Sequence, residues 1–139
     1  VEVVLRTQAS IDALIAIKAQ LPELVVGAGT VICQDSLNRA LDAGADFIVT
    51  PAISEKLLTA LNDCSVPVLP GISNTADILL AREFGYREMK LFPASLSGGA
   101  PFIQAMSSLF PDTIFCPTGG VNLKNLNGKL KNILVGIFY

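Results

Sequence analysis

The stretch Glu88-Met89-Lys90-Leu91-Phe92-Pro93 is a short apolar run that predicts a buried β-strand with a lysine in its interior. Apolar surroundings disfavour an ammonium ion, so we expect the pKa of Lys90 to fall and part of its amine to be neutral. A neutral amine is a nucleophile, which makes Lys90 a candidate catalytic residue. The alternative is that Lys90 lies near a strand end and its amine reaches solvent past its own aliphatic stem.

Outward from this strand, short β-branched runs alternate with segments whose apolar residues recur at the three- and four-residue spacing of helices. The predicted strands are Glu2–Thr7, Leu24–Gly29, Phe47–Pro51, Val66–Ile72, Glu88–Pro93, Ile114–Thr118 and Ile133–Gly136. The predicted helices are Ser10–Gln20, Ser36–Ala43, Ser54–Asn62, Thr75–Phe84 and Ala100–Leu109. Ser10, Ser54 and Asn74 are expected to cap helices, and Gly44 and Gly85 to end them. This alternation predicts a parallel sheet with helical crossovers.

Residues suited to ligand binding gather at the carboxyl ends of the predicted strands. They are Arg6-Thr7, Gly29-Thr30, Thr50-Pro51, Pro70-Gly71, Phe92-Pro93 and Thr118-Gly119-Gly120. In a (β/α)8 TIM barrel these ends form the rim that carries the active site, whereas no GxGxxG turn indicates a dinucleotide-binding sheet. We therefore predict an α/β fold of the TIM-barrel type. Seven strands are predicted where a closed barrel has eight, so residues 1–139 are expected to form one incomplete barrel domain.

The amino-acid composition excludes several classes of function. The 139 residues are 51% hydrophobic and carry a net charge of only −2, which gives no basic surface for nucleic acid or an anionic membrane. Apolar stretches are too short to span a bilayer, and the first residues show no secretion signal, so a cytoplasmic location is expected. The three cysteines, Cys33, Cys64 and Cys116, are expected to be small core residues. Histidine is absent, which excludes a Ser-His-Asp triad and disfavours zinc; no metal or other cofactor is expected.

Two segments near the amino terminus offer further candidates. Alternation along the first strand places Glu2 and Arg6 on one face, where they could be an acid/base group and a carboxylate clamp or merely an exposed ion pair. In Gly27-Ala28-Gly29-Thr30, the glycines permit close approach and the Thr30 hydroxyl could bind a carboxylate. An ordinary turn would explain the same residues.

A third segment, Pro117-Thr118-Gly119-Gly120, lies on the penultimate predicted strand. Consecutive glycine N–H groups can form an anion site, and many barrels bind phosphate after strands seven and eight.

Five motifs in this order resemble the family of 2-keto-3-deoxy-6-phosphogluconate (KDPG) aldolases, which overlaps with that of 4-hydroxy-2-oxoglutarate (KHG) aldolases. They are Glu2-Val3-Val4-Leu5-Arg6-Thr7, Val26-Gly27-Ala28-Gly29-Thr30-Val31, Pro70-Gly71-Ile72-Ser73, Lys90-Leu91-Phe92-Pro93-Ala94 and Phe115-Cys116-Pro117-Thr118-Gly119-Gly120-Val121. The resemblance covers about residues 1 to 121. It implies a class I aldolase on a TIM barrel, normally a homotrimer, that acts on small keto acids in the Entner–Doudoroff pathway.

The same resemblance implies roles for individual residues. Lys90 matches the Schiff-base lysine and Glu2 the proton-transferring carboxylate. Arg6 and Thr30 match the groups that hold the pyruvyl carboxylate. The remaining matches are Pro70 and Phe92, which line the pocket, and Thr118, Gly119 and Gly120, which form part of the phosphate site.

The chain also departs from the family. The family's first strand and helix are absent before Val1, and its last helix is absent after Tyr139. The family has a Gly-Gly-Ser phosphate contact after its eighth strand, whereas Gly136 is followed by Ile137-Phe138-Tyr139, which favours tolerance of unphosphorylated substrates.

Two other functions stay open. One is a truncated, non-catalytic fragment that self-associates or binds a partner through exposed sheet edges. The other is an isomerase-type barrel that uses Glu2 as its base and gives Lys90 no role.

Overall fold

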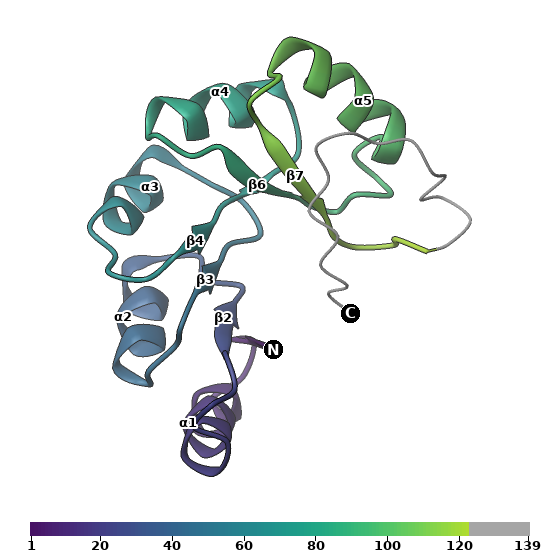
Figure 1. Ribbon diagram of the computed structural model, residues 1–139. Coiled ribbons are helices and arrows are strands. Elements are labelled where there is room, and N and C mark those ends of the chain that lie inside the picture. The colour runs from purple at the N-terminus through teal and green to yellow at the C-terminus, as the bar shows by residue number, and fades with distance from the viewer. Residues whose placement is uncertain (123–139) are drawn as a thin grey trace. The chain divides into compact units, whose positions relative to one another are not determined.

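A computed structural model describes residues 1–122 of the chain, in which parallel strands alternate with helices (Figure 1). The predicted strand Ile133–Gly136 lies outside the described residues. The described chain divides into two compact units, Val1–Leu69 and the part from Pro70 onward. The expectation of a single domain over residues 1–139 therefore stays a prediction.

The first unit contains a four-stranded sheet in which every pair of neighbours is parallel. Its strands, in spatial order, are β1 (Glu2–Val4), β2 (Gly27–Gly29), β3 (Ile48–Val49) and β4 (Val68–Leu69). The connecting helices are α1 (Ala9–Gln20), α2 (Gln34–Asp42) and α3 (Glu55–Asn62), and α2 packs against α3. The spatial order of these strands follows the chain order, as short βα repeats dictate.

The second unit contains a three-stranded parallel sheet. Its strands are β5 (Gly71–Ile72), β6 (Glu88–Leu91) and β7 (Ile114–Pro117), and β6 lies between the other two. The helices are α4 (Thr75–Glu83) and α5 (Gly99–Leu109). The α/β class and the parallel sheet that the sequence predicts are thus confirmed for the described residues.

The predicted single strand Val66–Ile72 is wrong, because β4 and β5 are separate strands in different sheets. Pro70 lies between them and has no N–H group to donate to a sheet ladder. Its carbonyl oxygen still accepts a hydrogen bond of 2.8 Å from the backbone N–H of Lys90. Proline therefore ends one sheet and leaves an acceptor for the next.

Most helix ends follow the predicted signals. The side chains of Ser54 and Asn74 accept hydrogen bonds from the N–H groups of Leu57 (3.2 Å) and Asp77 (3.0 Å), which confirms both N-caps. The predicted cap at Ser10 is wrong. Helix α1 begins at Ala9, and the Ser10 hydroxyl instead accepts a hydrogen bond of 3.3 Å from the N–H of Thr7.

Gly44 and Gly85 follow α2 and α4 with φ angles of +82° and +91°, in the left-handed region that glycine adopts without strain. Both therefore end their helices as predicted.

Each unit has its own apolar core. Fully buried side chains include Leu14, Val26, Leu37, Ile48 and Leu58 in the first unit, and Ile72, Ile78, Met89, Leu91, Ile103 and Phe115 in the second. Cys116 is buried as predicted, but Cys33 is exposed at the N-cap of α2. The core expectation for Cys33 is therefore wrong. No helix among residues 1–122 is long and apolar enough to cross a membrane.

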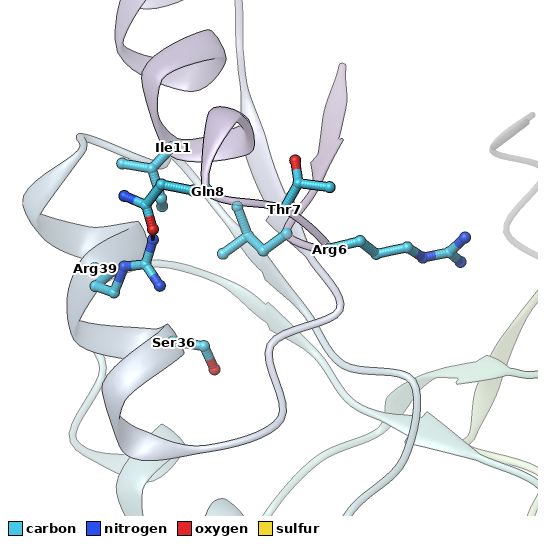
Figure 2. Close-up of a pocket in the computed structure, with 7 residues that line it drawn as sticks. Arg6, Thr7, Gln8, Ile11, Ser36 and Arg39 are labelled. Atoms are coloured by element: carbon cyan, nitrogen blue, oxygen red, sulfur yellow. Dashed lines mark hydrogen bonds between the residues drawn. The ribbon is translucent and has the colours of Figure 1, made fainter.

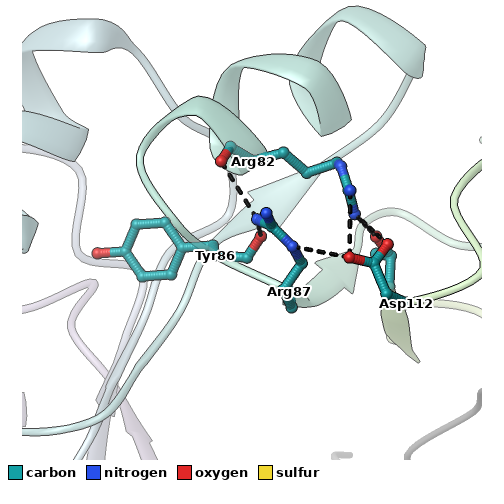
Figure 3. A network of polar contacts seen from close by, with 5 residues as sticks. Arg82, Tyr86, Arg87 and Asp112 are labelled. Carbon is teal, nitrogen blue, oxygen red and sulfur yellow. Dashed lines mark hydrogen bonds and ion pairs between the residues drawn. The ribbon is translucent and has the colours of Figure 1, made fainter.

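An ion-pair cluster lies where β6 and β7 begin (Figure 3). The Asp112 carboxylate accepts hydrogen bonds from Arg82 Nη1 at 2.6 Å and from Arg87 Nε at 3.0 Å. The Arg82 guanidinium also holds the Thr113 hydroxyl at 2.7 Å and lies 5.2 Å from the centroid of the Phe110 ring. These contacts, chiefly those of Arg82, lower the pKa of Asp112. The cluster joins the end of α4 to the start of β7, away from the strand ends that carry the candidate site.

Candidate active site

Lys90 is a buried residue of the central strand of the second unit, with only 7% of its surface exposed. Its sheet partners are Gly71 on β5 and Cys116 on β7. The amine nitrogen lies 5.0 Å from the centroid of the Phe92 ring, within the range of a cation–π contact. The predicted burial of Lys90 is therefore confirmed. Its role as a nucleophile stays a prediction.

The loops after β6 and β7 are joined to each other by their backbones. The N–H of Ala94 donates to the carbonyl oxygen of Thr118 at 2.7 Å, and that of Ser95 donates to Gly119 at 3.1 Å. Gly119 has a φ of +89°, and a Cβ added there would lie 3.2 Å from the Phe92 ring. The ring that contacts the Lys90 amine therefore also supports the turn at Gly119.

The second unit thus brings six predicted site residues into one connected set: Pro70, Lys90, Phe92, Thr118, Gly119 and Gly120. Pro70 directly follows the end of β4 at Leu69, as the sequence suggested, and precedes β5. Its carbonyl oxygen accepts the hydrogen bond from the Lys90 N–H, which holds it beside the lysine.

Sequence reasoning missed Ser95. A Cβ added to Gly120 would collide with the Ser95 side chain, whose Cβ would be 2.7 Å away. Gly120 has a φ of +73° as well, so glycine is needed there on two counts. An exposed serine in an irregular loop has no periodic signal that could have marked it.

The first unit holds Glu2, Arg6 and Thr30. Glu2 pairs with Gly27 across β1 and β2, and its side chain extends over Gly29. A Cβ added to Gly29 would collide with the Glu2 carboxylate, and one added to Gly27 would collide with the Phe47 ring. The two glycines of β2 therefore make room for a carboxylate and an aromatic ring. The interpretation of these glycines as an ordinary turn is wrong, because they are strand residues.

Thr30 follows β2 directly and is half-buried with a φ of +61°. A β-branched residue rarely adopts this left-handed conformation, which carries strain on the order of 1–3 kcal/mol and is most often found at functional sites. Arg6 lies beyond β1, since that strand ends at Val4, and its side chain is exposed. The N–H of Leu5 donates to the carbonyl oxygen of Gly29 at 2.9 Å, which holds the chain next to Arg6 beside the end of β2.

These nine residues therefore fall into two sets, Glu2, Arg6 and Thr30 in the first unit and the remaining six in the second. No cluster of three or more Cys, Asp or Glu side chains suited to a metal ion occurs among residues 1–122.

Comparison with known proteins identifies the family of the chain. The family model described as KDPG and KHG aldolase matches residues 1–137. The 2-dehydro-3-deoxy-phosphogluconate aldolase of Pseudomonas aeruginosa is 46% identical over 125 residues, 90% of this chain and 57% of that protein. The KHG/KDPG aldolase of Escherichia coli K12 is 40% identical over 135 residues, 96% of this chain and 63% of that protein. The chain thus spans less than two thirds of the length of these curated relatives.

The fold agrees with the sequence comparison. The crystal structure of KDPG aldolase from Legionella pneumophila, with pyruvate captured as a covalent carbinolamine intermediate, matches with a TM-score of 0.89 at 38% identity. The match covers 95% of this chain and 65% of that one. The α/β fold is therefore of the TIM-barrel type and corresponds to part of such a barrel, as the sequence predicts.

Proposed function

This chain belongs to the KDPG and KHG aldolase family, and we propose that it carries out class I aldol cleavage with Lys90 as the amine that bonds to the substrate. The observation that carries the proposal is the burial of Lys90 on the central strand of its sheet, over the Phe92 ring. A relative of the same fold holds pyruvate as a covalent carbinolamine, which is the first adduct that an amine and a 2-keto acid form. The proposed substrates are KDPG, cleaved to pyruvate and glyceraldehyde 3-phosphate, and KHG, cleaved to pyruvate and glyoxylate.

The first chemical step builds the iminium. The neutral Lys90 amine attacks the C2 ketone of the substrate to give a carbinolamine, and loss of water from it leaves a cationic C=N bond. This iminium withdraws electrons from the C3–C4 bond. An amine kept away from bulk water suits this step, because water would stabilise its unreactive protonated form.

The second step breaks the carbon–carbon bond. A base removes the proton of the C4 hydroxyl, the C3–C4 electron pair moves into an enamine, and the aldehyde leaves. Protonation of the enamine at C3 and addition of water then release pyruvate and restore the Lys90 amine. We assign the proton transfers to Glu2, whose carboxylate is held over Gly29.

The remaining residues bind the substrate in this proposal. Arg6 and Thr30 hold the carboxylate of the keto acid, through a guanidinium and a hydroxyl. Pro70 and Phe92 line the pocket beside the amine. Thr118, Gly119 and Gly120, in the turn after β7, bind the phosphate of KDPG.

Borohydride trapping tests the role of Lys90. Incubation with pyruvate and sodium borohydride should attach a reduced pyruvyl group to the peptide that contains Lys90, as mass spectrometry would show. Lys90→Met should abolish the adduct, whereas Lys56→Met, which changes an exposed lysine of α3, should not. No adduct on the unchanged chain, or an adduct on another lysine, would sink the proposal.

We also propose that the chain assembles as a homo-oligomer, a trimer by family resemblance, and works in the cytoplasm. Apolar side chains on and after α1 support assembly, because Ile15, Leu21 and Val25 are each about half exposed or more. Ile15→Lys should lower the mass measured by sedimentation velocity if this surface is buried between copies. An unchanged mass would argue against it.

A further inference from the structure

A cavity of about 240 Å³ lies in the first unit, beside the start of α1 and against α2 (Figure 2). Its apolar wall is formed by Leu5 and Ile11, and its polar side includes Thr7, Gln8 and Arg39. Arginine side chains line it and no carboxylate does. The cavity therefore carries positive charge that its own lining does not balance.

Arg39 is the centre of this charge. Its Nη2 donates to the amide oxygen of Gln8 at 3.1 Å, which is a neutral partner. Among residues 1–122, Lys18 pairs with Asp46, and Arg82 and Arg87 share Asp112, but Arg39 forms no ion pair. A guanidinium has five N–H donors, so most of those of Arg39 remain available to a ligand.

The neighbouring hydroxyls are already engaged. The Ser36 hydroxyl donates to the carbonyl oxygen of Cys33 at 2.9 Å, and the Thr7 and Ser10 hydroxyls lie 3.2 Å apart. Figure 2 shows the Arg6 guanidinium extending away from Arg39. The groups that a ligand would meet are thus the Arg39 guanidinium and the Gln8 amide.

We propose that this cavity binds a small oxyanion, a phosphate or carboxylate group, through Arg39 and Gln8. Guanidinium groups bind both kinds of oxyanion with paired, charge-assisted hydrogen bonds. The volume is below the roughly 300–1,000 Å³ of pockets for drug-sized ligands, which favours a small anion. Leu5 and Ile11 can accept a short apolar portion of an organic acid or phosphate ester. Arg39 and Gln8 are not among the residues assigned to aldol cleavage. Arg6, which is, also lines the cavity, but its guanidinium extends away from Arg39.

An NMR titration of the ¹⁵N-labelled chain with inorganic phosphate tests the site. The backbone amides of residues 5–11 and 36–39 should shift and saturate, and a sodium chloride titration to equal ionic strength should not reproduce the shifts. Gln8→Glu gives Arg39 a carboxylate of its own and should weaken phosphate binding roughly tenfold or more, as should Arg39→Gln.

The matched control is Gln34→Glu, which makes the same glutamine-to-glutamate change on α2. The Gln34 side chain donates a hydrogen bond to Asn38 and does not line the cavity. It should leave the affinity within about twofold, since an exposed charge at a distance is screened. A parallel titration with acetate separates a site for carboxylates from one for phosphates.

The proposal is overturned if these amides do not shift in the unchanged chain, or if Gln8→Glu and Arg39→Gln shift them as strongly. Circular dichroism establishes that each variant is folded. Phosphate bound at the turn of residues 118–120 would shift a different set of amides, which Gln8→Glu should not affect. A negative result in this titration would therefore not bear on the proposed aldolase chemistry. A negative borohydride-trapping result would likewise not bear on the anion site.

Discussion

The Glu2 carboxylate occupies the space on β2 into which a side chain at position 29 would project. Position 29 must therefore be glycine because the carboxylate of the neighbouring strand fills the space that a side chain would need. The two residues belong to different predicted motifs, and the parallel pairing of β1 with β2 brings them together.

Gly29→Ala should destabilise the chain by about 1–3 kcal/mol, because the added methyl group must displace the Glu2 side chain. Urea unfolding of the single and double variants measures this. The loss should shrink when Gly29→Ala is made together with Glu2→Ala, since the displaced group is then absent. Equal losses in the two backgrounds would show that the collision is not the cause.

Phe92→Leu should lower the free energy of unfolding by about 1–2 kcal/mol and slow formation of the pyruvate adduct, because leucine cannot contact both the Lys90 amine and Gly119. Phe102→Leu on α5 is the matched control. It should reduce stability by a similar amount and leave the rate of trapping unchanged. A slower rate in both variants would assign the effect to stability alone.

Asp46 should make stability depend on acid pH. The Asp46 carboxylate accepts two hydrogen bonds of 2.7 Å from the Lys18 amine and one from the Val26 N–H, and these lower its pKa below the ordinary 3.8. A pKa lowered in the folded state contributes stability that is fully present above the unfolded value and lost as pH falls through the folded one.

Asp46→Asn should therefore reduce stability at pH 7, and the difference from the unchanged chain should shrink as the pH falls from 3.8 through the lower pKa of the folded state. Urea unfolding at a series of pH values gives both curves. A difference that stays constant down to the acid limit would mean that the carboxylate charge plays no part.

Cys33 should be the most reactive of the three cysteines toward iodoacetamide. Hydrogen bonds from Ser36 lower the pKa of its exposed thiol, whereas Cys116 is 1% exposed. Ser36→Ala should slow the alkylation of Cys33 at pH 7.5, because less thiolate is then present. Peptide mass spectrometry over time separates the three sites, with Cys64 as the internal reference. Modification of Cys116 before Cys33 would contradict the expectation.

The sequence predicts the order of the elements well because short apolar runs alternate with segments whose apolar residues have helical spacing. The lysine of β6 stands out for the same reason, since a charge inside an apolar run is locally visible. The break at Pro70 was missed because Val66–Ile72 is apolar on both sides of the proline, although a Pro-Gly pair often interrupts a strand. Whether a missing N–H ends a ladder depends on the neighbouring strand, and that information is not local.

The sequence also did not predict two contacts between segments that are far apart in the chain. Gln8 meets Arg39 across 31 positions, and Ser95 meets Gly120 through two irregular loops. Neither pair has a spacing that helix or strand geometry would reveal. The candidate residues could be named from motifs, but the partners that hold them could not.

The two backbone hydrogen bonds between the loops after β6 and β7 give those loops a common stiffness. Under the proposed function, this turn binds the phosphate of the substrate while Lys90 bonds to its keto carbon. The same two backbone hydrogen bonds would then set the spacing between the groups that hold the two ends of the substrate.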